Sequence, residues 1–320
     1  MVELSISMEG WFGLQWPQWK RLAHAVEDLG FAGLYLSDHS VMPAPPDYPS
    51  LEMIVALTYL ADHTDRIRFG SMVSPLSIRD PVLLARQAAA LDDLSDGRMI
   101  LGVGTGWAQR EHTMFGYELG DIPTRFARLE EGLEVITRLL RSDSPVSFDG
   151  QFFRLQGAVL PPTRRRGGPP IMIGGSGPKR TLPLVARFAD VWNAQVVGPA
   201  QVRDRSAVLD GLLVAAGRRP EDVRRTQNVP VLCWRTPAEL ALRIRGYSRY
   251  SDWRELSVDE LAEVIRTAPG FVGTPEVVVE QIRTFEAAGI SEISLQWTAA
   301  DDIEGLEMLA AEVLPHVTAY

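Results

Sequence analysis

Short apolar runs alternate with amphipathic stretches along the first third of the chain. Leu4–Met8, Gly33–Ser37, Ile67–Ser71 and Arg98–Val103 are compact segments bounded by glycine or polar residues, which is typical of buried strands. Between them, stretches such as Trp16–Leu29 place apolar residues three and four positions apart, which predicts helices. Strands that alternate with helices predict a parallel sheet, because each strand returns to the next through a helix.

The same alternation continues to the end of the chain. Four further strands are predicted at Ile171–Ile173, Val191–Asn193, Arg225–Leu232 and Glu292–Gln296. The remaining helices are expected at Leu51–Asp62, Pro81–Leu94, Thr124–Arg141, Lys179–Phe188, Val202–Ala216, Thr274–Ala288 and Ile303–Val317. Eight strand–helix units predict an α/β fold, a closed (βα)8 TIM barrel, with a doubly wound open sheet as the alternative.

Two segments interrupt this repeat, so the barrel is expected to carry insertions after strands 4 and 7. Residues 142–168 hold an Asp-Gly turn at 149–150 between aromatic residues, which predicts a β-hairpin. Residues 234–271, with an irregular helix at Pro237–Ile265, are the candidate lid over the site, and their aromatic residues are Tyr247, Tyr250 and Trp253. Because no low-complexity linker divides the chain, residues 1–320 are expected to form a single domain.

Composition excludes several classes of protein. Of the 320 residues, 46% are hydrophobic and 23% charged, which is ordinary for a globular protein with a sizeable core. A net charge of −9 argues against a nucleic-acid or anionic-membrane surface. No stretch approaches a membrane span, and the N-terminus does not resemble a signal peptide, so we expect a cytoplasmic protein. The single cysteine, Cys233, follows an apolar run and is expected to be a buried, inert thiol.

In a barrel, the residues that follow the carboxyl end of each strand share one face, and this face carries the chemistry. The residues that this rule selects are Glu9, Asp38, His39, 72–77, 105–107, 174–177, 194–196, Trp234, Arg235, Gln296 and Trp297. No Cys/His pair at metal-ligand spacing and no HExxH motif occurs, so no metal site is expected.

Asp38 and His39 are the one place where a histidine falls at a strand end beside a carboxylate. Histidine transfers protons near neutral pH, and the neighbouring Asp38 could orient it; a core or loop histidine is the alternative interpretation. Trp11, Trp107 and Trp234 also lie near strand ends, where they could form the walls of a substrate pocket or simply the rim of a barrel.

A glycine turn, Gly174-Gly175-Ser176-Gly177, separates the strand at Ile171–Ile173 from a helix. Glycines allow close approach of a ligand to the backbone, and a helix N-terminus favours negative charge, so the turn is a candidate phosphate site. An ordinary tight turn is the alternative. Thr105 and Gly106, after the fourth strand, offer a hydroxyl and backbone N–H groups to the same ligand.

Taken together and in order, several stretches resemble the bacterial luciferase-like superfamily, and within it the deazaflavin (coenzyme F(420))-dependent oxidoreductases. They are GLYLSDH (33–39), RFGSMVSPLSIRDPVLLARQAAALDDLSDGRMILGVGTGW (68–107), REHTMFGYELGDIPTRFARLEEGLEVITRLL (110–140), FDGQFFRL (148–155), PPIMIGGSGPKRTLPLVARFADVWN (169–193) and GTPEVVVEQIRTFEAAGISEISL (273–295).

The resemblance implies a (βα)8 barrel that is usually dimeric and binds its cofactor at the carboxyl ends of the strands. It implies a cofactor phosphate on Gly174, Gly175, Ser176 and Gly177, aided by Thr105 and Gly106. It places Asp38 and His39 beside the reactive ring. It also implies a cis peptide bond at Met72–Val73, which would form a bulge that supports the ring.

One departure from the family concerns the substrate. Its glucose-6-phosphate dehydrogenases carry a glutamate directly after the Gly-Thr-Gly turn, where this chain has Trp107. We therefore expect an apolar vestibule and a small, apolar organic substrate, with hydride transfer to or from coenzyme F(420).

The alternative within the superfamily is an FMN-dependent monooxygenase, and the alternative outside it is a barrel that binds no cofactor productively. Lys179 and Arg180 could hold the acidic tail that distinguishes coenzyme F(420) from FMN. A homodimer is expected, with a small-molecule substrate and neither nucleic acid nor membrane as a partner.

Overall fold

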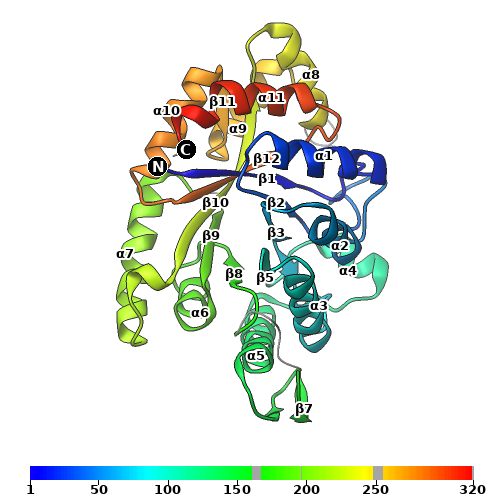
Figure 1. The fold of residues 1–320 in the computed structure, drawn as a ribbon, viewed down its shortest axis with the longest axis vertical. Coiled ribbons are helices and arrows are strands. Elements are labelled where there is room, and N and C mark those ends of the chain that lie inside the picture. Colours follow the sequence, from blue (N-terminus) through cyan, green and yellow to red (C-terminus); the bar gives the residue numbers. More distant parts are fainter. Residues whose placement is uncertain (161–166, 196, 248–254, 319–320) are drawn as a thin grey trace.

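The computed structural model describes residues 1–160, 167–195, 197–247 and 255–318, and its strands close into a parallel barrel (Figure 1). The barrel strands in chain order are β1 (Glu3–Met8), β2 (Gly33–Leu36), β3 (Arg68–Ser71), β5 (Met99–Gly104), β8 (Ile171–Gly174), β9 (Val191–Gln195), β10 (Arg224–Cys233) and β12 (Glu292–Trp297). Each pairs with the next, and β12 pairs with β1, so the ring is complete. The predicted TIM barrel is confirmed.

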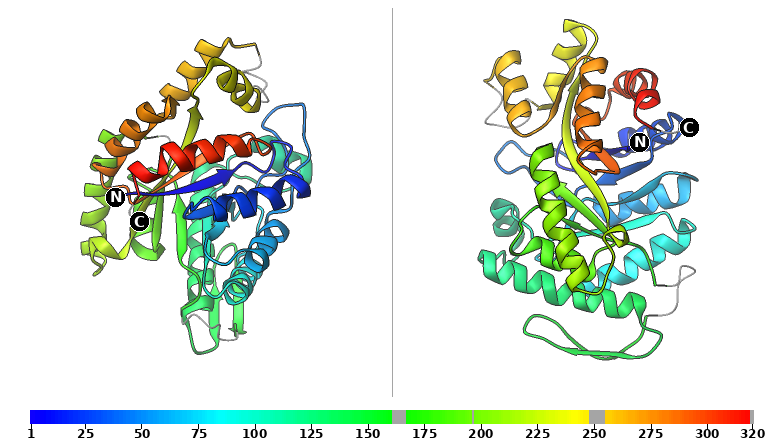
Figure 2. Two further views of the ribbon diagram at one scale, coloured as in Figure 1. Left: turned by 45° about the horizontal axis from the view of Figure 1, so that its top comes forward. Right: turned by 90° about the vertical axis from the view of Figure 1, so that its left-hand side faces the viewer.

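The helices surround this barrel (Figure 2). They are α1 (Trp16–Asp28), α2 (Met53–His63), α3 (Pro81–Leu94), α4 (Gln109–Phe115), α5 (Ile122–Arg141), α6 (Thr181–Phe188), α7 (Pro199–Ala215), α8 (Pro237–Tyr247), α9 (Val258–Thr267), α10 (Pro275–Glu286) and α11 (Ile303–Glu312). Short 3₁₀ turns lie at Pro220–Asp222 and Leu314–His316. No helix in the described part of the chain is both long and apolar enough to cross a membrane.

Side chains that alternate along the strands build two apolar layers. Leu34, Phe69, Leu101 and Ile173 point outward and belong to the large cluster that packs the barrel against its helices. Tyr35, Ile100 and Met172, their neighbours on three of these strands, point inward and form a smaller cluster with Met72 and Val191. The outer layer fixes the helices, and the inner layer fills the barrel below the catalytic face.

The helix boundaries follow from local capping. Asp80 caps α3, since its carboxylate accepts a hydrogen bond from the Leu83 N–H at 2.8 Å, and Pro81 occupies the first turn. Helix α5 begins at Ile122, two residues before its predicted start at Thr124. There Asp121 is the cap, and its carboxylate accepts from the Thr124 N–H at 2.9 Å.

The first insertion is the expected hairpin. Strands β6 (Val146–Asp149) and β7 (Arg154–Ala158) pair antiparallel and project beyond α5 at the lower end of the molecule in Figure 1. Two short barrel-edge strands were not predicted: β4 (Ser74–Pro75), which pairs with β5, and β11 (Phe271–Gly273), which pairs with the end of β10. Both are too short to show a sequence period.

The second insertion is not one irregular helix but two helices, α8 and α9, which share a small core of their own. Arg243 ties α8 to the barrel: its side chain donates to the Cys233 carbonyl at 2.6 Å and to the Asp302 carboxylate at 2.8 Å. Of the aromatic residues expected in the lid, Tyr250 and Trp253 lie outside the described residues.

Close strand contact makes Gly102 irreplaceable, because a Cβ atom there would lie 2.0 Å from the Ser71 carbonyl oxygen. We expect Gly102→Ala to lower the free energy of unfolding by about 3 kcal/mol or more through overpacking. Gly211, exposed on α7 with no atom near its Cβ position, is the matched control. Gly211→Ala should raise the free energy of unfolding by about 0.5–1 kcal/mol. Urea denaturation of both variants checks the pair, and equal stabilities would contradict the register of β3 and β5.

Candidate active site

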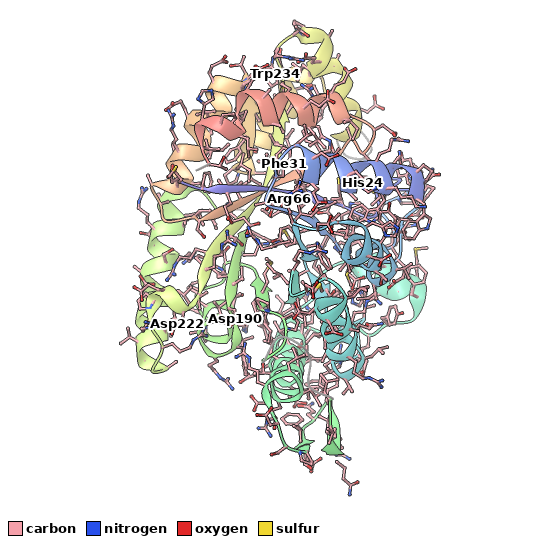
Figure 3. The ribbon with its side chains drawn as sticks, viewed as in Figure 1. His24, Phe31, Arg66, Asp190, Asp222 and Trp234 are labelled. Carbon is pink, nitrogen blue, oxygen red and sulfur yellow. The ribbon has the colours of Figure 1, made fainter. Side chains whose placement is uncertain are left out.

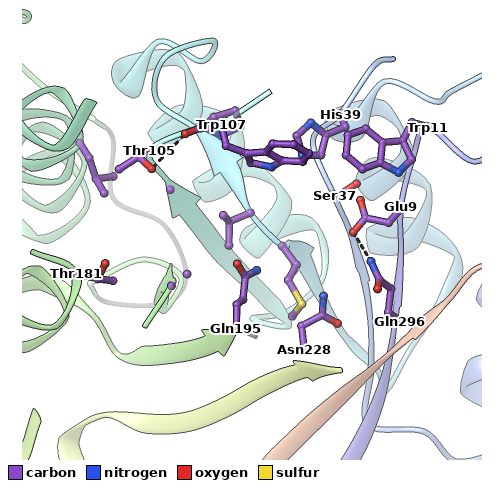
Figure 4. Close-up of a pocket in the computed structure, with 18 of the residues that line it drawn as sticks. Glu9, Trp11, Ser37, His39, Thr105, Trp107, Thr181, Gln195, Asn228 and Gln296 are labelled. Carbon is purple, nitrogen blue, oxygen red and sulfur yellow. Dashed lines mark hydrogen bonds between the residues drawn. The ribbon is translucent and has the colours of Figure 1, made fainter. Parts of the chain in front are cut away.

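A cavity of about 470 Å³ opens at the carboxyl ends of the barrel strands, on the face where the sequence placed the chemistry (Figure 4). Six of the eight residues expected to bind the cofactor line it: Met72, Val73, Thr105, Gly106, Gly174 and Gly175. Three residues expected at the substrate or reactive end also line it, namely His39, Trp11 and Trp107.

The wall beside β3 is a backbone bulge. The Met72–Val73 peptide bond is cis, as the family resemblance implied. The side chain of Val73 lies between Gly104 and Gly174, where a Cβ would stand 2.7 Å and 3.2 Å from its methyl groups. Both glycines therefore leave the room that the Val73 side chain occupies, and Val73 lines the cavity between them.

The glycine turn divides into residues that line the cavity and residues that hold the turn. Gly175 adopts φ +115°, a left-handed conformation that favours glycine. Ser176 and Gly177 do not line the cavity. The Ser176 hydroxyl bonds to the backbone of Gln195 at 3.0 and 3.1 Å, and the Gly177 carbonyl accepts the Thr181 N–H at 3.0 Å.

Thr181, at the first position of α6, lines the cavity beside this turn. Its hydroxyl lies 3.2 Å from the position of a Cβ on Gly177 and 3.5 Å from that of one on Gly175. Sequence reasoning missed Thr181 because it expected the helix to begin at Lys179.

His39 stands at the opposite end of the cavity with its Nδ1 atom 3.0 Å from a carboxylate oxygen of Glu111. The other oxygen of Glu111 accepts the Ser40 N–H at 2.5 Å. The Trp11 ring stacks on the imidazole at 4.2 Å, and Trp107 meets it edge-on at 5.5 Å. With Nδ1 engaged, Nε2 is the imidazole nitrogen left for a ligand.

Asp38 does not orient His39, contrary to the expectation from their adjacency. Its carboxylate forms a bidentate pair with Arg79, at 2.8 and 2.6 Å, and Arg79 also contacts Glu52 at 2.7 Å. Successive side chains on an extended backbone point to opposite sides, so neighbours in sequence diverge here. Glu111, on α4, takes the role that was expected of Asp38.

Burial and neighbouring charges shift the pKa values of His39 and Glu111. Burial lowers the pKa of His39, but the hydrogen bond to Glu111 and the negative charges of Glu9, Glu111 and Asp38 outweigh it, so the pKa is raised. Burial raises the pKa of Glu111, but its hydrogen bonds to His39 and the Ser40 N–H outweigh this effect and the pKa is lowered. The side chains of His39 and Glu111 are only 12% and 2% exposed, so both effects act with little solvent screening.

Trp234 is not part of the cavity, which corrects its assignment to the substrate pocket. It packs instead on the small core of the second insertion, with Leu240 and Ile244, and lies near α8 at the top of Figure 3. The end of β10, Val231–Cys233, pairs with β11 beyond its pairing with β12, so Trp234 follows this extension and not the barrel rim. The insertion still reaches the cavity through Ala268, at the end of α9.

The remaining wall of the cavity is polar. The Gln296 side chain donates to Glu9 Oε1 at 2.7 Å, and Ser7 donates to the Asn228 amide oxygen at 2.6 Å. The strand-end rule found Glu9 and Gln296. The same rule selected Gln195, within 194–196, at the end of β9, whereas nothing in the sequence distinguished Asn228, which lies inside β10. Among the described residues, no group of three side chains is placed to hold a metal ion.

A model of the family described as luciferase-like monooxygenase matches residues 13–292. The chain belongs to this family. An F(420)-dependent glucose-6-phosphate dehydrogenase of Microbacterium testaceum (strain StLB037) is 27% identical over 307 residues, which cover 91% of this chain and 90% of that protein.

Two solved structures have a similar fold. An F(420)-dependent secondary alcohol dehydrogenase in complex with an F(420)-acetone adduct superposes with a TM-score of 0.84 at 19% identity, covering 99% of both chains. A monooxygenase from Streptomyces bottropensis superposes with a TM-score of 0.78 at 23% identity, covering 99% of this chain and 100% of that one. At these identities the likeness shows the luciferase-like fold alone.

The Glu111–His39 contact predicts how the histidine titrates. In Glu111→Gln we expect the pKa of His39 to fall below that of the native protein, because burial persists while the favourable charge is lost. Because the pKa of His39 is higher in the folded protein than its unfolded value of 6.5, protonated His39 stabilises the fold below pH 6.5. This contribution is lost as the pH rises through the pKa of the folded state. Because the pKa of Glu111 is lower in the folded protein than its unfolded value of 4.5, the ionised carboxylate stabilises the fold above pH 4.5.

The native protein should therefore exceed Glu111→Gln in stability most between about pH 4.5 and 6.5. Nuclear magnetic resonance titration of the His39 ring protons measures the pKa directly. Glu118→Gln, an exposed carboxylate near the same helix, is the control that should leave it unchanged. An unchanged His39 pKa in Glu111→Gln would contradict the pairing.

Proposed function

We propose that this protein transfers a hydride between the deazaflavin coenzyme F(420) and a small organic substrate. The observation that carries the proposal is the arrangement of one cavity: a glycine turn at one end, the Met72–Val73 bulge in the middle, and His39 held by Glu111 at the other. The residues that line the cavity run from Gly174 and Gly175 at the end of β8 across the barrel mouth to His39 after β2.

The chain's own residues fit such a coenzyme. Gly174 and Gly175 carry no side chain over the turn, and the Thr181 hydroxyl lies beside it, as a phosphate requires. Val73 offers an apolar surface on which a flat ring could rest. Coenzyme F(420) supplies a carbon that accepts or donates a hydride, and the protein supplies orientation and shelter from water.

Basic side chains near the glycine turn favour the deazaflavin coenzyme over FMN. The Arg180 guanidinium lies 5.7 Å from the centre of the Phe126 ring, which lines the cavity, and Arg125 donates to the Gly106 carbonyl at 2.9 Å. Positive charge at this end suits the acidic tail that FMN lacks. The similarity to named F(420)-dependent relatives supports the same choice. An FMN monooxygenase remains the second candidate, supported by the monooxygenase of similar fold.

His39 would donate or accept the proton that accompanies hydride transfer, through Nε2. Glu111 would hold Nδ1, fix the orientation of the ring and stabilise the imidazolium when it is protonated. Asp38 would act at a distance, because Arg79 holds its carboxylate. Trp11, buried against the imidazole, would exclude water from the transfer.

A sugar phosphate does not suit the substrate end. No lysine or arginine side chain lines the cavity in the described part of the chain, and Trp107 lines it at the position where the family resemblance implies a glutamate in the glucose-6-phosphate dehydrogenases. We also propose a homodimer, supported by the exposed apolar side chains Val55 on α2 and Leu83 on α3, which is adjacent to α2. A cytoplasmic location stays a prediction from the sequence.

Cofactor choice is tested by titrating the cofactor-free protein with coenzyme F(420) and with FMN, followed by fluorescence. We expect coenzyme F(420) to bind at least about 10-fold more tightly, a difference of about 1.4 kcal/mol. Gly175→Ala should weaken that binding by a similar factor, because φ +115° strains any side chain. Gly198→Ala, which has open space and lies before α7, is the control. Tighter binding of FMN would favour the monooxygenase.

Removal of the imidazole should separate binding from chemistry. We expect His39→Ala to keep its affinity for coenzyme F(420) and to lose about 10²-fold or more in turnover with any substrate found by a spectrophotometric screen. His24→Ala, on the outer helix α1, should keep full turnover. Near-native turnover in His39→Ala would remove this histidine from the mechanism.

A further inference from the structure

Glu9 carries a buried carboxylate oxygen that nothing in the described structure satisfies. Oε1 accepts the Gln296 amide at 2.7 Å, whereas Oε2 is buried and has no hydrogen-bond partner among the described residues. The side chain lines the cavity at the end of β1. Buried carboxylate oxygens are normally paired with donors, so the missing donor is expected to come from a ligand.

The charge balance around the cavity makes that donor a cation. Arg79 pairs with both Asp38 and Glu52, and the His39 imidazole, which pairs with Glu111, also interacts with the negative charge of Glu9. No lysine or arginine side chain lines the cavity in the described ranges. Glu9, Asp38 and Glu111 thus face only the positive charges of Arg79 and protonated His39, so at least one negative charge is left over, and this charge attracts a cation more strongly than a neutral donor.

The position of Glu9 places it at the end of the cavity where His39 lies and where the substrate is proposed to bind. In the order of the barrel, β1 stands opposite β8, which leads into the glycine turn. Figure 4 shows Thr105 and Thr181 on one side, and Glu9 and Gln296 with Trp11 and His39 on the other. The phosphate end and the carboxylate are thus separated by the width of the barrel mouth.

The neighbours of Glu9 define the rest of the ligand. Trp11 and Trp107 meet edge-to-face with ring centres 5.8 Å apart and form an aromatic wall. Such a wall accommodates an apolar body, and an exposed indole face such as that of Trp107 also attracts an ammonium group. Asn228, on the same polar side of the cavity, offers a further amide to a polar group.

We propose that the substrate is an amine with an apolar or aromatic body, and that its protonated nitrogen binds Glu9 Oε2. The nitrogen serves recognition only, and the hydride is exchanged at a carbon elsewhere in the molecule. That this amine is the substrate rests on the proposed function, whereas ammonium binding at Glu9 stands on the geometry alone. The vestibule, expected from the sequence to be apolar, thus combines an aromatic wall with one acidic group.

The test compares three probes of one shape on the protein loaded with oxidised coenzyme F(420): benzylammonium, benzyl alcohol and benzoate, at pH 7. Binding is followed by fluorescence. We expect benzylammonium to bind at least about 10-fold more tightly than benzyl alcohol, and benzoate to bind most weakly. Glu9→Gln, which keeps the shape of the side chain, should reduce this preference to less than about 2-fold. Glu280→Gln, an exposed carboxylate on α10, should keep it.

Two results would overturn the proposal: no preference for benzylammonium in the native protein, or an undiminished preference in Glu9→Gln. A third result would also overturn it. If Glu9→Gln bound the three probes as the native protein does but bound coenzyme F(420) more weakly, Glu9 would be a coenzyme-binding residue. If the native protein binds no coenzyme F(420), the proposed function fails. The same titrations on the cofactor-free protein, followed by tryptophan fluorescence, then still decide the assignment of Glu9.

Discussion

Closure of the parallel barrel is the constraint on which the site depends. Pairing of β9 with β10 and of β12 with β1 brings the carboxyl ends of strands that are distant in sequence onto one rim. The register of β1 against β12 sets Met8 opposite Trp297, and this places Glu9 within reach of Gln296. A barrel left open at either pairing would separate the two ends of the cavity.

Much of this arrangement was predictable because regular strands and helices leave a period in the sequence. Helix α3 was predicted to the residue, since Asp80 and Pro81 mark its start and the apolar period its length. Strands β4 and β11 were not, because two or three residues carry no period. The assignment of Trp234 failed because the strand-end rule does not say where the chain turns after the strand.

In the candidate site, too, some features could be predicted from the sequence and others depend on tertiary contacts. The glycine turn was found from its own residues, and the Met72–Val73 bulge, which is present, through a family resemblance. The partner of His39 was not found, because adjacency along the chain favoured Asp38 while the fold brings Glu111 from α4. Burial of a carboxylate such as Glu111 depends on tertiary contacts, and no local pattern marks it. The pairing of charged side chains at the barrel mouth therefore could not be predicted from the sequence.

The central claim is that a deazaflavin coenzyme spans this cavity from the glycine turn to His39. The most direct measurement is a crystal structure of the protein with oxidised coenzyme F(420). We predict its phosphate on the turn at Gly174–Gly177 within reach of the Thr181 hydroxyl, its ring on Val73, and His39 Nε2 facing the reactive edge. A phosphate bound away from this turn, or a ring that leaves Val73 and His39 uncovered, would contradict the account.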